Sequence, residues 1–457
     1  MKKLIGTKDF YVMVLKIAVP IMVQMGITNF VGMLDNLMVG RIGTEQMTGV
    51  AVVNQLLFIF HICIFGGLSG AGIFGSQFYG KNDRDGLQYV FRYKLLVASL
   101  ISVVAILILA IGADGLIGLF LTDNGEGDVA LTLKYAKDYL FYMLFSLLPF
   151  GIKECYASSL KETERTLLPM IGSSIAVLTN FVLNLILIFG LCGAPKLGVV
   201  GAAVATLVSR VLELIFIVIS AHLIKDTFLK GVYRSFKIPG ALLKDLLIKG
   251  TPLLVNEAMW SGSVTALNQC YSMRGLSVVA AINIMSTISN MFNFVFISLG
   301  SAIAIVVGKQ LGAGKFEEAK DSAAKLIAFS TVCCAFMSIL MILVSGFFVD
   351  FYKTSEAIKT LAYTFVVICA IVMPFDAFNH GCYFTLRSGG KTFITFLFDS
   401  VFAWVVSIPV ANLLVRLTPL EIEPLFAICS SLCLVKCVIG FVLVKKGIWV
   451  QNMVNNS

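Results

Sequence analysis

An ionisable side chain within a long apolar stretch is the first feature of this sequence that could do chemistry. Residues 13–43 are long and apolar enough to cross a bilayer, which takes about 20 helical residues, yet they include Asp35. A carboxylate inside a membrane span costs on the order of 2.5–3.5 kcal/mol on insertion scales. We therefore expect Asp35 to serve an ion or substrate pathway. The alternative is a position near the membrane surface, before Arg41, where Asp35 only caps or pairs with a neighbour.

Polar side chains in the fifth and sixth apolar stretches could act together with Asp35. Asn180 and Asn184 are four residues apart and share one helix face, and Thr206 lies among small residues in the next stretch. Carboxylate, amide and hydroxyl oxygens are the ligands that a hard cation such as Na⁺ accepts. These four residues form our candidate cation-coupling site in the first half of the chain. Hydrogen bonding between helices is the alternative explanation for the two asparagines.

The second half of the chain contains a different set of buried acids. Glu257 follows Pro252, which frees a backbone carbonyl in the preceding turn, and Asp376 and His380 are four residues apart. Two carboxylates that face each other in a low dielectric need a proton or a cation between them. Glu257, Asp376 and His380 are therefore our candidate coupling residues in this half. A static buried hydrogen-bond network is the alternative.

Methionine and phenylalanine are abundant, with 17 and 36 residues. Flexible thioethers and aromatic rings suit an apolar site that accepts many ligands, although such residues also face lipid or fill the interior. The candidate substrate-binding residues lie in the first, seventh and eighth apolar stretches: Met25, Asn36, Asn256, Met259, Trp260 and Met285. Two further acids with weaker context are Glu213 and Asp399.

Composition defines the class of protein that must position these residues. Of the 457 residues, 58% are hydrophobic and only 13% are charged, whereas a soluble domain carries about 25% charged residues. The mean hydropathy of +0.93 agrees, so this is a polytopic membrane protein. We expect a bacterial-type plasma (inner) membrane location. The formal charge of +9 then reflects basic loops and predicts no nucleic-acid partner.

No cofactor or fixed metal is expected. The 11 cysteines show no metal-binding spacing, and the three histidines are scattered. Two glycine-rich segments, which begin at Phe74 and Val307, lack the spacing of a phosphate-binding loop. We expect them to end the second and eighth spans as helix caps. Without a nucleotide site, the energy source must be an ion gradient, with Na⁺ or H⁺ as the coupling ion.

Hydropathy and turn residues predict an all-α protein with twelve transmembrane helices in two six-helix lobes. The predicted domains are an N-terminal lobe (1–222), a basic cytoplasmic linker (223–247) and a C-terminal lobe (248–457). Lysine and arginine concentrate in alternate loops, which places both termini in the cytoplasm. No small-residue cleavage site follows the first apolar stretch, so we expect it to remain in the protein. The predicted spans are 13–38, 48–74, 89–121, 130–158, 167–191, 198–222, 248–272, 278–307, 321–349, 357–385, 394–416 and 423–445.

The two halves resemble each other when the sequence is shifted by 232 positions, since 20 plus 232 is 252. Pro20 then falls on Pro252 and Gly80 on Gly312, with no gap between them. Six spans in each half give a parallel repeat about an axis along the membrane normal. The buried acids do not follow the repeat: Asp35, for example, lies opposite a leucine. Packing should be shared by duplicated lobes, so we interpret these acids as functional.

Together these features resemble the multidrug and toxic compound extrusion (MATE) family, over nearly the whole chain. The resemblance is carried by short segments in a fixed order: Pro20 with Asp35 to Gly43, Gly198 to Thr206, Asn256-Glu257, Gly308 to Gly314, Pro374 with Asp376, and Leu386 to Lys391. It implies a transporter, not an enzyme, that exports organic cations or drug-like molecules in exchange for Na⁺ or H⁺. By position it assigns Asp35, Asn180, Asn184 and Thr206 to the first-lobe cation site and Glu257 and Asp376 to second-lobe acids of the NorM-like branch. Asn184 departs from the DinF-like branch, which tends to have Asp there.

Three other functions are alternatives to this one. A lipid-linked oligosaccharide flippase of related architecture needs a large cationic cleft, whereas the intramembrane charges considered above are mostly acidic. An intramembrane enzyme needs a nucleophile and a base, and only His380 beside Asp376 hints at one. An ion channel needs a repeated filter segment, and none was found. The expected partners are small organic cations and membrane lipid, and the expected oligomeric state is a monomer.

Overall fold

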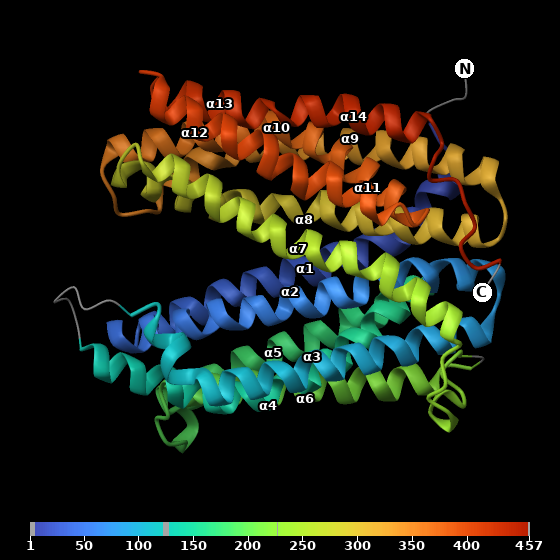
Figure 1. Ribbon diagram of the computed structural model, residues 1–457. Coiled ribbons are helices and arrows are strands. Elements are labelled where there is room, and N and C mark those ends of the chain that lie inside the picture. The colour runs from blue at the N-terminus through green and yellow to red at the C-terminus, as the bar shows by residue number, and fades with distance from the viewer. Residues whose placement is uncertain (1–4, 122–127, 226, 456–457) are drawn as a thin grey trace. The chain divides into compact units, whose positions relative to one another are not determined.

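The computed structural model describes residues 5–121, 128–225 and 227–455 (Figure 1). Within the described segments the ordered elements are helical, and no strand occurs. Five side chains inside these ranges are also outside the description: Val31, Met33, Asn36, Leu37 and Cys192.

In the part of the chain that the structure describes, twelve long helical segments confirm the predicted all-α fold and its twelve spans. Ten of the described helices are apolar enough to cross a membrane; α4 and α7 carry more polar residues but match them in length. Two short 3₁₀ helices, η1 (Leu191–Gly193) and η2 (Val232–Arg234), lie in loops. The first ten helices are α1 (Lys8–Gly40), α2 (Thr44–Lys81), α3 (Arg84–Gly118), α4 (Val129–Glu162), α5 (Leu167–Phe189), α6 (Val199–Leu223), α7 (Gly240–Ser272), α8 (Leu276–Gly312), α9 (Phe316–Asp350) and α10 (Glu356–Ser388).

The last two spans are interrupted helices. Residues 392–417 run through α11 (Thr392–Phe396), two π-helical turns, η3 (Leu397–Val401) and η4 (Ala403–Ser407), and α12 (Ile408–Leu417). Proline in the first turn of α12 explains part of this, since Pro409 cannot donate to the preceding turn. The final span consists of α13 (Ile422–Ser431) and α14 (Cys433–Lys445). π-helical turns are frequent at functional sites. Asp399 lies in the first of the two turns and is therefore a candidate functional residue.

Local sequence signals explain several helix ends and bends. Asp128 caps α4 by accepting a hydrogen bond from the backbone N–H of Leu131. Gly190 ends α5 with a φ of 75°, a conformation that favours glycine. The helix α7 begins at Gly240, directly after a proline, and therefore earlier than the predicted span. Its first turns bury Leu242 and Leu246, so burial of one apolar face extends the helix into the predicted linker.

Apolar side chains on α3 and α9 are exposed at helical spacing. Leu100, Leu107 and Ile111 on α3 are 64%, 54% and 85% exposed, and α9 has a similar face. Large apolar faces of this kind are not stable in water. They define the surface that lipid covers, as expected for a multi-pass membrane protein.

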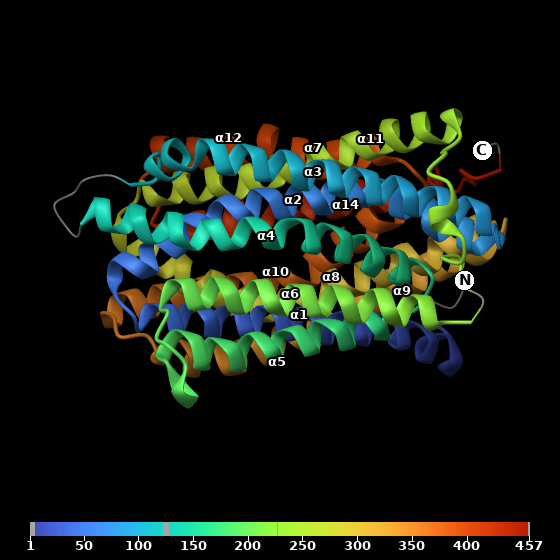
Figure 2. The same ribbon diagram turned by 90° about the horizontal axis from the view of Figure 1, so that it is seen from below.

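The helices form two compact units. One contains Val23–Gly75 and Arg84–Leu243; the other contains α1 as far as Met22, Ser76–Asp83 and Lys244–Ser457. In the first unit α6 packs against both α4 and α5, and Figure 2 shows these three helices side by side. In the second unit α10 packs against α8, α9, α13 and α14. The helices α1 and α2 each contribute to both units, and α1 passes from one to the other just after Pro20.

Each glycine-rich segment first continues its helix and then ends it, so the helices run further than predicted and the expected capping turns follow. Asn82 and Gly314 have positive φ values of 58° and 74°, and the N–H groups of Asp83 and Lys315 donate to the carbonyls of Phe78 and Gln310. Phe74–Lys81 is the last part of α2, and the segment from Val307 continues α8 to Gly312. A Cβ atom at Gly80 would overlap the carbonyl oxygen of Lys309, and one at Gly312 would overlap that of Gln77. Glycine at these positions allows two helix backbones to touch.

Candidate functional site

The first-half site is built around Asp35 on α1. Asn184 on α5 donates a 2.7 Å hydrogen bond to Asp35 Oδ1. One turn earlier on the same face, Asn180 lies beside Thr206 on α6, with 3.2 Å between their polar atoms. The apolar remainder of α5 and α6 packs these helices together, which brings the three side chains to Asp35. The structure thus gathers all four predicted residues of this half in one place.

The orientation of the Asn180 amide indicates what this cluster could bind. With its nitrogen toward Asp35, Asn180 donates to the carboxylate at 2.9 and 3.0 Å and accepts from Thr206 Oγ1 at 3.2 Å. With its oxygen toward Asp35, Asn180 accepts a 3.1 Å hydrogen bond from the Asn184 amide, which also donates to Asp35. The orientation with the nitrogen toward Asp35 satisfies both polar atoms of Asn180, so amide donors surround the carboxylate.

The same cluster contains a buried oxygen without a partner. Asn184 Oδ1 is buried and has no hydrogen-bond partner among the described residues. Leaving such an acceptor unsatisfied costs about 1–3 kcal/mol, so its presence calls for an explanation. With both asparagines turned, Asn184, Asn180, Thr206 and Asp35 would offer the oxygen ligands of a Na⁺ site.

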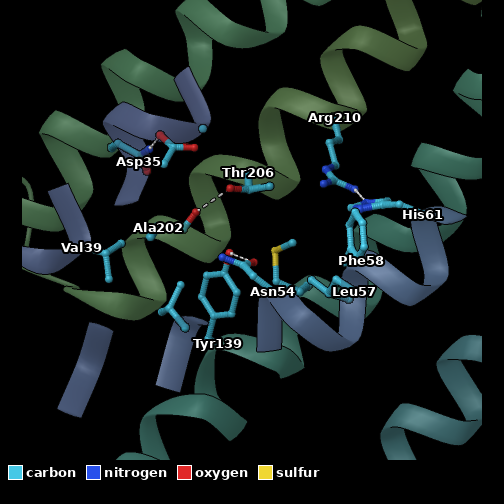
Figure 3. Close-up of a pocket in the computed structure, with 14 residues that line it drawn as sticks. Asp35, Val39, Asn54, Leu57, Phe58, His61, Tyr139, Ala202, Thr206 and Arg210 are labelled. Carbon is cyan, nitrogen blue, oxygen red and sulfur yellow. Dashed lines mark hydrogen bonds between the residues drawn. The ribbon is translucent and has the colours of Figure 1, made fainter. Parts of the chain in front are cut away.

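A cavity of about 310 Å³ opens beside this cluster (Figure 3). Asp35, Asn184 and Thr206 line it, together with residues of α2, α4 and α6 that are mostly apolar. All of its described lining residues belong to the same compact unit. The remaining lining residues are Gly32, Val39, Val50, Asn54, Leu57, Phe58, His61, Tyr139, Met143, Ala202 and Arg210. A volume of this size accommodates a small ligand in addition to an ion.

The structure also places basic residues inside the spans, and these were not among the predicted site residues. Arg210 on α6 and His61 on α2 line the cavity, and Lys153 on α4 is 6% exposed. In the other compact unit, Lys436 on α14 pairs with Asp399 of that same unit. The signal was available, because each lies within an apolar stretch. The predicted site residues include no lysine or arginine.

The second-half acids surround a network centred on Asp399. Lys436 Nζ lies 2.9 Å from Asp399 Oδ1, and Asn256 donates to Asp399 Oδ2 at 3.3 Å. Ser400 in turn donates to the side-chain and backbone oxygens of Asn256, both at 2.8 Å. Asp399 had only weak context in the sequence, whereas the structure makes it the hub of this network. The sequence feature that could have indicated Asp399 is Pro409 in the same span, because this proline follows the π-helical turns that contain Asp399.

The other predicted residues of this half interact with Asp399 only at longer range. Asp399 acts electrostatically on both Glu257 and Asp376, and no hydrogen bond joins these two in the described part of the chain. His380 Nδ1 lies 3.2 Å from the backbone oxygen of Asp376, and its ring centre lies 4.6 Å from that of Phe296 in a tilted arrangement. The spacing of Asp376 and His380 thus produces a helix-backbone contact, while Lys436 supplies the charge that faces the acids.

The predicted substrate-binding residues do not share one environment. Met25 is half-buried on α1, Met285 is buried with its sulfur 3.5 Å from Cys369 Sγ, and Trp260 is 46% exposed. Met259 accepts a 2.9 Å hydrogen bond from Trp404 through its carbonyl. The remaining two are Asn256, which belongs to the Asp399 network, and Asn36, whose side chain lies outside the described residues. The described lining of the cavity includes none of the six.

Comparison with known proteins identifies the class. The MatE family model matches residues 20–186 and 252–413, so this chain belongs to the multidrug and toxic compound extrusion (MATE) family. The two matches begin at the prolines that the shift of 232 superimposes, which supports the predicted duplication. Family membership also confirms that the protein is a membrane transporter.

Curated relatives extend the likeness over most of the chain. A probable multidrug resistance protein NorM of Halalkalibacterium halodurans is 24% identical and covers 84% of this chain and 83% of its own length. A probable multidrug resistance protein of Bacillus subtilis, YoeA, is 27% identical and covers 86% of this chain and 84% of its own length.

Solved structures share the fold. An outward-facing multidrug resistance MATE transporter superposes with a TM-score of 0.85, at 18% identity, and covers 97% of this chain and 99% of its own. A mutant of the Vibrio cholerae MATE transporter VcmN has a TM-score of 0.86 at 14% identity, with coverage of 97% and 98%. At such low identity these two structures support the fold alone.

Proposed function

We propose that this protein is a secondary active multidrug antiporter of the inner membrane, with both termini in the cytoplasm. It exports amphipathic organic cations in exchange for Na⁺ or H⁺. The curated relatives named above, which are described as probable multidrug resistance proteins, support efflux. The observation that carries the coupling is the cluster at Asp35, where a buried oxygen of Asn184 lacks a partner beside a carboxylate.

Competition for one carboxylate provides a simple mechanism. Cargo that binds near Asp35 and a cation or proton that binds to it cannot both use the same charge. Each ligand must favour a different conformation, because a ligand with equal affinity for two states shifts neither. Pro20 lies where α1 passes between the compact units, and proline removes a helix hydrogen bond there. Bending at this position connects the state of Asp35 to the arrangement of the helices.

Transport in everted vesicles with an imposed Na⁺ or pH gradient tests the proposal. The wild type should accumulate a cationic dye when the gradient of its coupling ion, Na⁺ or H⁺, is applied, and Asp35→Asn should lose this dependence. Asp114→Asn is the matched control, since that carboxylate is exposed and pairs with Lys137 at the end of α3. Normal gradient-driven exchange in Asp35→Asn would reject coupling at this site.

Glu257→Gln decides whether the second half also couples. We expect this variant to keep gradient-driven transport, because the positive charge of Arg387 acts on Glu257, whereas the described interactions of Asp35 include no basic side chain. Loss of coupling in Glu257→Gln with normal coupling in Asp35→Asn would move the coupling site to the second half.

A further inference from the structure

The cavity beside Asp35 also contains a positive charge. Arg210 lies one turn after Thr206 on α6, on the same helix face, and both line the cavity. In Figure 3 Asp35 and Arg210 lie on opposite sides of Thr206. Tyr139 interacts electrostatically with both charges. The cavity is therefore bipolar, with a carboxylate at one end and a guanidinium at the other.

Arg210 has no carboxylate within ion-pair distance among the described residues. Its polar contact is with His61 Nε2, at 3.4 Å, and its guanidinium lies 4.7 Å from the centre of the Phe150 ring. A guanidinium has five N–H donors. Most of the donors of Arg210 are thus free to bind another acceptor.

The two acids that act electrostatically on Arg210 are committed to other partners. Lys153 pairs with Glu154 and lies 3.7 Å from Glu213, and Ser173 donates a 2.6 Å hydrogen bond to Glu213. Glu154 and Glu213 act on Arg210 at longer range. Lys153 thereby holds both carboxylates away from Arg210, which leaves the guanidinium facing the cavity.

The uncharged lining between the two ends fits an amphipathic molecule. Asn54 and Tyr139 meet at 3.4 Å through their side-chain oxygens, and Leu57, Phe58 and Met143 add apolar surface. A planar apolar body could span this region with a positive group near Asp35. Its negative group would then reach Arg210. A guanidinium group binds a carboxylate through two parallel hydrogen bonds.

We infer that Arg210, supported by His61, is a subsite for the carboxylate of zwitterionic amphipathic cargo. This inference rests on the proposed function and specifies its substrate class. A cargo with both charges satisfies both ends of the cavity, whereas a simple organic cation satisfies only Asp35. The protein should therefore distinguish two molecules that differ only in a free carboxylate.

A rhodamine that carries a free benzoate and the methyl ester of the same dye form such a pair. Efflux of each is measured in vesicles that contain wild type, Arg210→Gln or Arg210→Lys. We expect Arg210→Gln to reduce the efflux rate of the acid at least about tenfold relative to the ester. Arg210→Lys keeps the charge and should recover part of the loss. Arg234→Gln is the matched control, because that arginine is exposed in the linker.

The outcomes separate this inference from the proposed function. Equal loss of both dyes in Arg210→Gln would mean that Arg210 only maintains the structure, and an unchanged ratio would mean that it does not contact the carboxylate; either result overturns the inference. A wild type that exports the ester but not the acid would also overturn the inference, although the proposed efflux of cations would still hold. A wild type that exports neither dye would instead contradict the proposed function.

Binding to purified protein provides a second test if Arg210→Gln does not reach the membrane. Fluorescence anisotropy of the two dyes is compared between wild type and Arg210→Lys. We expect the acid to lose affinity several-fold in Arg210→Lys, because lysine cannot form the two-point contact, and the ester to be unaffected. An identical affinity change for both dyes contradicts the subsite.

Discussion

Gly80 on α2 and Gly312 on α8 make equivalent contacts with each other's helix. Each glycine contacts the residue that lies three positions before the other glycine. Gly80 meets the backbone of Lys309, and Gly312 meets that of Gln77. The same shift of 232 positions relates the two glycines and also relates Gln77 to Lys309. The contact is thus reciprocal, as a local two-fold axis between the ends of α2 and α8 requires.

Alanine at either glycine should destabilise the protein. The added Cβ atom would overlap a backbone carbonyl, which cannot move aside as a side chain can. We expect Gly80→Ala and Gly312→Ala each to cost about 1–3 kcal/mol, measured as a lower melting temperature in detergent. Gly115→Ala is the control, since nothing lies within 4 Å of its Cβ position. It should be neutral or slightly stabilising; equal melting temperatures for all three variants would contradict the close contact.

Removal of the unpartnered oxygen of Asn184 should weaken cation activation. We expect Asn184→Ala to raise the Na⁺ concentration for half-maximal dye efflux about tenfold, which equals roughly 1.4 kcal/mol. Ser174→Ala is the control on the same helix, because that hydroxyl only bonds the carbonyl of Met170. An unchanged Na⁺ curve in Asn184→Ala would show that this oxygen does not bind the ion. A flat curve in the wild type would leave H⁺ as the coupling ion.

The buried Lys94–Glu162 pair should matter far more than exposed ion pairs. Lys94 has no exposed side-chain surface and donates to both carboxylate oxygens, at 2.6 and 2.5 Å. Lys94→Met leaves Glu162 uncompensated and should cost about 3–5 kcal/mol of stability. Lys315→Met removes the exposed partner of Glu318 and should cost at most about 1 kcal/mol. Similar melting temperatures for the two variants would contradict this difference.

The Asp399 network should be structural if coupling occurs at Asp35. Lys436→Met leaves the Asp399 charge unpaired and should lower stability by about 3 kcal/mol. The double variant Lys436→Met/Asp399→Asn should recover most of that stability and keep gradient-driven efflux. A double variant that is stable but does not transport would assign a functional role to the pair.

The sequence by itself determined the elements and most of the chemistry. Its composition required a membrane protein, and long apolar runs broken by polar loops located all twelve spans, because a helix must cross a bilayer of fixed thickness. The four-residue spacing of Asn180 and Asn184 placed both on one helix face, and the cost of a buried charge singled out Asp35.

Only the tertiary structure decided which charges meet. Asp35 and Asn184 are far apart in the sequence, and helix packing places them 2.7 Å apart. Lys153 pairs with Glu154 and lies 3.7 Å from Glu213, while Arg210 has no ion-pair partner among the described residues. Glu257 and Asp376 both lie near Asp399, whose partner Lys436 comes from the last span. Such pairings depend on how helices rotate and pack against each other, and helical periodicity specifies faces without specifying their neighbours.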